Sequence, residues 1–225
     1  VTKICEKAFS DSSIELLSFS PKSLLSRIGN YAFENSEIKK IFLPKSLEEV
    51  DPFWIKGCDK LSSITVDPLN PYFCNKNECL FYIDTTKNEI LFALHEFKGD
   101  FSVPEGTTKI AEYSFSNVKG IESFESKVST LKEIGSYAFN QCDNLKSFVV
   151  QQEDGELTLF SYCLANCMNL STVEISCKSL NLLDYCFYNS QLTSLKITDS
   201  LIVNLNRNTF KECKSLSDIS FQKSS

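Results

Sequence analysis

The chain has 225 residues, of which 42% are hydrophobic and 23% are charged, a balance typical of a folded protein. Its net charge of -6 argues against a nucleic-acid partner, because binding to a phosphate backbone needs clustered Lys and Arg. No stretch approaches the roughly 18 uninterrupted apolar residues of a membrane-spanning helix, so we expect no membrane insertion by this segment.

The sequence repeats itself from its first residues onward. "IGNYAF" at 28–33 returns as "IGSYAF" at 134–139, and we call the first residue of each copy the anchor. Each anchor is followed five positions later by a large apolar residue. The pairs are Ile4/Phe9, Ile28/Phe33, Val50/Ile55, Ile110/Phe115, Ile134/Phe139, Leu159/Leu164, Leu182/Phe187 and Leu205/Phe210. Apart from one long gap, anchors lie 22 to 25 residues apart, which predicts a solenoid, because no copy can bury its apolar face alone.

A strand pattern, L-x-x-L-x-L, follows most anchors by 10 or 11 residues, as in "LSTVEI" (170–175) and "LTSLKI" (192–197). Its alternation buries one face of a strand and exposes the other. The pattern has a loose copy at "IELLSF" (14–19) and resumes after the long gap at "FSVP" (101–104). With these two copies included, we expect a parallel ladder of about nine strands on the concave face. Short helical or irregular turns would form the convex face, and the Phe series would form a buried spine.

The long gap contains an insertion at residues 67–100. "DPLNPYF" (67–73) favours a turn that stops the ladder, and "CLFYIDTTKNEILFAL" (79–94) predicts a β-hairpin that turns near Thr85–Lys87. This turn would place Cys79 opposite His95, the single histidine, with Cys74 nearby. The cluster is a candidate nucleophile pair or partial metal site. The alternative, which we favour, is an inert hairpin end or a local Cys74–Cys79 disulfide, with no catalysis, metal or cofactor.

The repeat register accounts for most of the ten cysteines. Cys58, Cys142, Cys167 and Cys213 occupy the ninth position after counting the anchor as first, while Cys163 and Cys186 occupy the fifth. We expect buried free thiols. Coils that stack at about 4.8 Å would also permit disulfides between Cys142 and Cys167 or between Cys163 and Cys186.

The third and fifth residues of the strand pattern should point away from the core, toward a partner. They are Lys40, Phe42, Ser63, Thr65, Ser123, Glu125, Ser147, Val149, Thr172, Glu174, Ser194, Lys196, Asp218 and Ser220. Their hydroxyls would bind protein or glycan groups, and Phe42 is the expected aromatic anchor. The alternative is that they are solvated, strand-compatible residues without a partner.

The half-repeat I-G-x-Y-A-F-x-x-C-x-x-L-x-x-I-x-x-P resembles the BspA-like leucine-rich repeats, which occur in surface proteins of mucosal bacteria and parasitic protists. The insertion resembles the hairpin common in that family. The resemblance implies an α/β-type solenoid, a right-handed leucine-rich-repeat superhelix that forms one domain over residues 1–225. It also implies a non-enzymatic binding module of a cell-surface adhesion or antigen protein. Its partners would be protein or glycan ligands on host cells, matrix or other microbes. Ile55 and Leu164 depart from the consensus Phe.

Two other functions stay open at this point. Ten free thiols would suit an intracellular, cytoplasmic scaffold or regulatory protein, and an enzyme would have to use Cys79 and His95. Neither end of the chain carries a polar capping segment. We therefore expect a fragment of a longer protein, with any signal and membrane anchor outside it. The oligomeric state and the ligand are not specified by these patterns.

Overall fold

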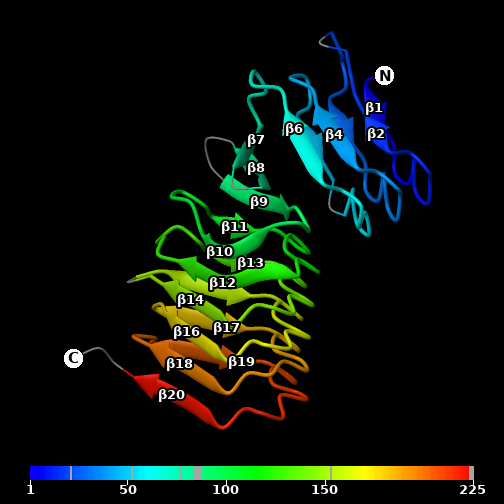
Figure 1. Ribbon diagram of the computed structural model, residues 1–225. Helices are drawn as coiled ribbons and strands as arrows, with labels where there is room; N and C mark the ends of the chain where they lie inside the picture. Colours follow the sequence, from blue (N-terminus) through cyan, green and yellow to red (C-terminus); the bar gives the residue numbers. More distant parts are fainter. Residues whose placement is uncertain (21, 52, 77, 84–87, 153, 223–225) are drawn as a thin grey trace. The chain divides into compact units, whose positions relative to one another are not determined.

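The computed structural model describes residues 1–225 except 21, 52, 77, 84–87, 153 and 223–225 (Figure 1). The chain divides into two compact units, Val1–Thr86 and Lys87–Ser225, called unit 1 and unit 2 below. Each is a stack of coils with parallel strands. The boundary falls inside the predicted insertion, and the expectation of one domain over 1–225 stays a prediction.

Unit 1 contains two short parallel sheets and one antiparallel pair. The anchors and the residues before them form the first sheet, β1 (Lys3–Ile4), β3 (Arg27–Ile28) and β5 (Glu49–Val50). The strand pattern forms the second sheet, β2 (Leu16–Leu17), β4 (Lys40–Leu43) and β6 (Ser63–Val66). The antiparallel pair consists of β7 (Phe73–Lys76) and β8 (Cys79–Ile83).

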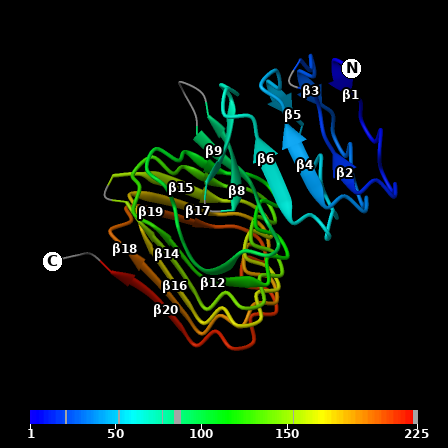
Figure 2. The same cartoon turned by 45° about the horizontal axis from the view of Figure 1, so that its top comes forward.

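Unit 2 continues both kinds of parallel ladder, and Figures 1 and 2 show its coils stacked in chain order. The long ladder contains β10 (Lys98–Ser102), β12 (Gly120–Ser126), β14 (Ser147–Gln151), β16 (Thr172–Ser176), β18 (Ser194–Thr198) and β20 (Asp218–Gln222). The anchor ladder contains β9 (Asn88–Ala93), β11 (Lys109–Ile110), β13 (Glu133–Ile134), β15 (Glu156–Leu159), β17 (Ser179–Leu182) and β19 (Ile202–Leu205).

The prediction of about nine strands with the L-x-x-L-x-L pattern is confirmed, since the described residues place three of them in unit 1 and six in unit 2. The expectation of a single ladder was wrong, because the anchors form a second one. The α/β assignment was also wrong, because the described part of the chain contains no helix. It is a β-solenoid whose coils are joined by turns.

Left-handed backbone positions explain why these turns are not helices. In every repeat the fourth and eighth residues have positive φ, as at Tyr137 (58°) and Gln141 (60°), and an α-helix cannot continue through such residues. Alternate amides also bond between coils instead of along the chain. Phe139 N–H donates to the carbonyl of Cys163 at 2.8 Å, and Gln141 N–H donates to that of Ala165 at 3.0 Å. The turns are therefore part of the stacking interface.

The predicted Phe spine is confirmed as core. Phe139 is fully buried; its ring stacks on that of Phe115 with centroids 4.9 Å apart, and it meets Phe124 edge-on at 4.8 Å. Ile55 and Leu164, which depart from the consensus, are also buried. Aliphatic side chains therefore fill the same space between coils that the rings fill elsewhere.

The insertion differs from its prediction in one respect. The turn at 67–73 is present, because the Asn70 amide donates to the carbonyls of Pro44 and Leu47 and its oxygen accepts from the N–H groups of Tyr72 and Phe73. The expected hairpin turn near Thr85–Lys87 lies outside the described residues. The β7–β8 pair was missed, because "FCNK" has no apolar alternation. In the described ranges, no helix is long and apolar enough to span a membrane.

Candidate binding surface

The long ladder of unit 2 carries side chains in two aligned rows that face away from its core. The first row runs Ser123, Ser147, Thr172, Ser194 and Asp218, and the second runs Glu125, Val149, Glu174, Lys196 and Ser220. All are exposed or half-buried, whereas the intervening Phe148, Val173 and Leu195 are at most 1% exposed. We call these two rows the ladder face. The alternation confirms the predicted orientation, while a binding role stays a prediction.

Several side chains of the ladder face have no partner among the described residues. The Ser123 hydroxyl donates to Asp100 at 2.6 Å, and Glu125 pairs with Lys127 at 2.8 Å. By contrast, within the described residues, the side chains of Ser147, Thr172, Glu174 and Lys196 make no hydrogen bond or ion pair. These four remain available to a ligand.

The corresponding face of unit 1 is smaller. Lys40 pairs in register with Ser63, and Phe42 pairs with Thr65. Phe42 points away from the core, since Ile41 and Leu43 on either side of it are buried, but its side chain is half-buried instead of fully exposed. The more exposed apolar group is Leu16, at 60%, which pairs with Lys40. It was missed because its strand pattern is loose.

The hairpin candidates belong to different units, Cys74 and Cys79 to unit 1 and His95 to unit 2. Cys79 is fully buried opposite Lys76, Cys74 lies opposite Phe81, and both thiols are free, so the alternative of a Cys74–Cys79 disulfide was wrong. Burial raises the pKa of the Cys79 thiol to about 12, whereas a nucleophilic thiol needs a lowered pKa. His95 belongs to unit 2, where its ring contacts Phe92 with centroids 5.8 Å apart. No group of His, Cys, Asp and Glu side chains suited to a metal ion occurs among the described residues.

The cysteines at the ninth repeat position share one hydrogen bond. Each thiol donates to the carbonyl of the Phe in the preceding repeat. The pairs are Cys58 to Phe33 at 2.9 Å, Cys142 to Phe115 at 3.0 Å, Cys167 to Phe139 at 3.1 Å and Cys213 to Phe187 at 2.8 Å. Because all ten cysteines are free, the expectation of free thiols is confirmed. The alternative pairings Cys142–Cys167 and Cys163–Cys186 are not formed.

Beyond the two predicted rows lies a third, which the sequence reasoning missed. Gln151, Ser176, Thr198 and Gln222 pair in register at the carboxyl ends of β14, β16, β18 and β20. Together with Lys127, Gln152 and Asp199, three of them line a shallow groove, which we call the strand-end groove. The missed signal was the seventh residue of the strand pattern, which has the same orientation as the third and fifth.

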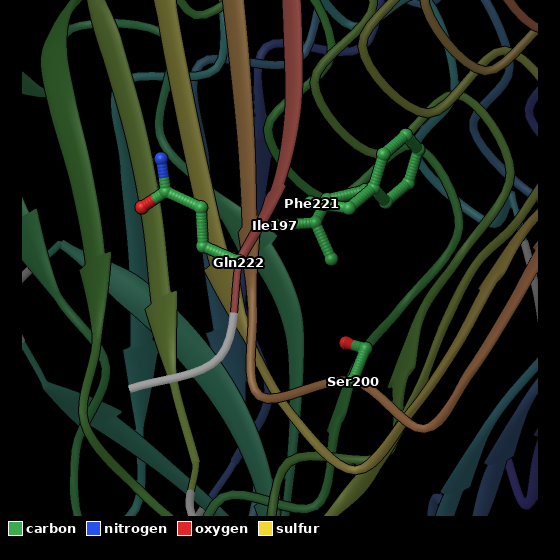
Figure 3. A pocket seen from close by; sticks show the side chains of 4 residues that line it. All are labelled: Ile197, Ser200, Phe221 and Gln222. Carbon is green, nitrogen blue, oxygen red and sulfur yellow. The ribbon is translucent and has the colours of Figure 1, made fainter. Parts of the chain in front are cut away.

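A second, smaller hollow lies at the β20 edge of the long ladder. It is lined by Ile197, Ser200, Phe221 and Gln222. Figure 3 shows Ile197 and Phe221 pointing to one side of the strands and Gln222 pointing to the other. The Gln222 side chain therefore lies on the side of the ladder face, while Phe221 continues the core positions and is 58% exposed at this last strand.

Known proteins identify the repeat. The model of the BspA-type leucine-rich-repeat region matches residues 1–90 and 85–217, whereas no curated protein matches the chain. A leucine-rich-repeat protein from Eubacterium ventriosum has a similar structure, with a TM-score of 0.80 and 22% identity over 97% of this chain. A leucine-rich cell-surface protein from Faecalibacterium prausnitzii has a TM-score of 0.68 and 16% identity over 98%. The pneumococcal vaccine antigen PcpA has a TM-score of 0.51 and 16% identity over 100% of this chain and 67% of its own.

These similarities concern the fold alone. The chain spans 57% of the length of the first two solved structures. At such low identities the shared property is the stacked leucine-rich-repeat architecture. The family match covers nearly the whole sequence and agrees with the resemblance noted in "IGNYAF" and "IGSYAF". The chain therefore belongs to the BspA-type leucine-rich-repeat family.

Proposed function

We propose that the chain is a non-enzymatic binding module of a cell-surface adhesion or antigen protein, and that it recognises host or microbial macromolecules. The observation that carries the proposal is the ladder face of unit 2, where Ser147, Thr172, Glu174 and Lys196 are aligned, accessible and without partners among the described residues. The similar structures support it, since one is named a cell-surface protein and another a vaccine antigen.

The dimensions of the ladder face favour an extended ligand. Four steps between the five strands that carry the two rows, at about 4.8 Å each, give a length of roughly 19 Å, and the distance from the third to the fifth residue of a strand is about 7 Å. The resulting area of roughly 130 Å² is well below the approximately 800 Å² that each partner contributes to a standard protein interface. An extended peptide or glycan chain therefore fits this face better than a flat globular surface does.

The charge distribution favours binding through short-range contacts and not through long-range electrostatic attraction of the ligand. The ladder face carries Glu125, Glu174 and Asp218 against Lys196, and Lys127 pairs with Glu125 beside it, so three acids meet two bases and no strong field of one sign forms. A field of one sign would raise the association rate of a charged ligand. Without such a field, we expect affinity to depend on hydrogen bonds and to change little with ionic strength.

The test is binding of the purified chain to arrays of extracellular-matrix proteins and glycans. The variant Glu174→Ala/Lys196→Ala alters the ladder face without changing the net charge. Its matched control is Glu156→Ala/Lys178→Ala, which removes one exposed acid and one exposed base at the anchor ladder. Saturable binding that only the first variant loses would support the proposal. Absence of binding by the folded chain, or equal loss in both variants, would contradict it.

The free thiols support a second candidate function. All ten cysteines are unpaired, which suits a reducing compartment and an intracellular scaffold or regulatory protein. The discriminating measurement is a thiol titration of the denatured chain after expression in an oxidising compartment. Retention of ten reactive thiols together with negative arrays would favour the scaffold. Disulfides in the secreted chain would exclude it.

A further inference from the structure

We infer that the strand-end groove of unit 2 binds a neutral, hydroxyl-rich glycan. This inference rests on the proposed function, because it names the ligand class and the part of the surface that holds it. The groove lies at the carboxyl ends of the long-ladder strands, where Gln151, Ser176 and Thr198 stand side by side in register. Its polar groups are thus spaced at the separation of neighbouring strands, about 4.8 Å.

One acceptor in the groove is held in place by a backbone conformation that does not recur in the repeat. Asp199 follows β18 and has a φ of 60°, although it occupies neither of the two left-handed positions that recur in every repeat. Its carboxylate accepts a hydrogen bond from the Ser176 hydroxyl at 3.2 Å, and its N–H donates to the Gln222 carbonyl at 2.9 Å. Asp199 is therefore held from both neighbouring strands of the ladder, and its carboxylate is oriented before any ligand arrives.

The groove also contains polar groups that the described protein leaves without partners. Gln152 is only 4% exposed; its amide nitrogen donates to the Leu131 carbonyl at 2.7 Å, but its Oε1 has no partner within the described residues. The Gln151 amide and the Thr198 hydroxyl also make no hydrogen bond to the rest of the described chain. The Gln152 Oε1 is closed off from solvent beside Gly155, so the groups that a ligand can reach are the Gln151 amide and the Thr198 hydroxyl. A ligand hydroxyl satisfies such groups well, because it donates and accepts at once.

The lining of the groove selects among ligand classes. None of the described residues that line it has an aromatic or large aliphatic side chain, so a peptide would find no pocket there for the apolar or aromatic anchors that dominate protein recognition. Lys127 is paired with Glu125 at 2.8 Å, and Asp199 lies on the same groove. A sulfated or otherwise anionic chain would thus meet a carboxylate as well as a neutralised lysine. These features favour an uncharged polyol over both alternatives.

The experiment is a titration of the full chain, labelled with 15N, with neutral oligosaccharides built from mannose, galactose or N-acetylglucosamine. A heparin oligosaccharide serves as the sulfated probe, and an extended acidic peptide as the protein-like one. The expected result is a saturable shift of the Gln151 and Gln152 side-chain amide resonances with at least one neutral sugar. Replacing Thr198 by the nearly isosteric Val should weaken binding about fivefold to tenfold, the effect of one lost hydrogen bond.

The control is Ser179→Ala, which removes a hydroxyl from β17 of the anchor ladder, outside both the groove and the ladder face; we expect less than a twofold change. Shifts only with heparin or the peptide would overturn the glycan inference, as would equal weakening by both variants. If the chain binds proteins on the arrays but no neutral sugar shifts either amide, the groove inference fails and the proposed function stands. If the arrays are also negative, both fail.

Discussion

The thiol of Cys167 donates a hydrogen bond to the carbonyl of Phe139 at 3.1 Å and thereby joins one coil to the one before it. Both residues are fully buried. The same relationship holds Cys142 to Phe115 at 3.0 Å. At the ninth repeat position a thiol thus supplies a small donor that remains compatible with an apolar interior.

Replacing Cys167 by alanine or by serine separates the contribution of packing from that of the hydrogen bond. We expect Cys167→Ala to lower the free energy of unfolding by about 1–2 kcal/mol, since it removes packing and leaves the Phe139 carbonyl without the thiol donor. Cys167→Ser should cost less, because a hydroxyl can still donate. Urea unfolding of both variants measures the difference. A serine variant less stable than the alanine variant would show that packing alone governs this position.

Burial of the thiols makes stability depend on pH in the alkaline range. Burial raises the pKa of Cys167 to about 12 and raises those of Cys142 and Cys163 as well, while unfolded thiols ionise near about 8.5. Between these values the unfolded chain binds fewer protons than the folded chain, so stability falls as pH rises. The stability that the buried thiols contribute is fully present below about pH 8.

We expect each such thiol to contribute up to about 1.4 kcal/mol of lost stability per pH unit above that point. The measurement is urea unfolding at pH 8 and pH 10. Cys167→Ser serves as the control, because a hydroxyl does not titrate there, and its loss between the two pH values should be smaller than that of the unaltered chain. Equal losses in the two proteins would contradict the assignment to Cys167.

The turns carry a row of stacked tyrosines that contributes to coil stacking. The Tyr162 ring lies 4.8 Å from Tyr137 and 4.9 Å from Tyr185, with planes inclined by 4° and 3°. Tyr162→Ala removes both stacked contacts and an edge-on contact with Tyr188, and we expect it to destabilise the chain by about 1–3 kcal/mol. Tyr162→Phe keeps the rings and should change stability by less than about 0.5 kcal/mol. Thermal unfolding tests both; similar losses would assign the effect to the hydroxyl instead of the stack.

The sequence predicts the long ladder well because period-two alternation is a strong local signal. Phe148 and Val150 are buried while Ser147 and Val149 are not, as the pattern indicates. Part of the anchor ladder was missed because some of its strands, such as Glu133–Ile134, have only two residues and are too short to show alternation. Of the two alternatives for the turns, helical or irregular, the helical one was wrong, because Tyr137 and Gln141 adopt positive φ without being glycine.

Part of the candidate site could likewise be predicted from the sequence, and part could not. The orientation of Thr172 and Glu174 follows from alternation, so the ladder face was predictable. The strand-end groove was not, since it depends on the conformation of Asp199 after β18 and on the burial of Gln152. Both are set by contacts with neighbouring coils that lie more than twenty residues away in sequence, and no local pattern encodes them.

Substitutions at the eighth repeat position test whether its positive φ limits which residues it can accept. Gly57 occupies it with a φ of 71°, and a Cβ added there would lie 2.2 Å from Oδ1 of Asn35. Gly57→Ala should therefore lower stability by about 1–2 kcal/mol, since alanine is strained at this φ and displaces the Asn35 side chain. Gln141→Ala, at the same repeat position, is the control and should be nearly neutral, because a Cβ is already accommodated there. Urea unfolding of both variants decides the matter: equal effects would mean that the contact with Asn35 adds nothing.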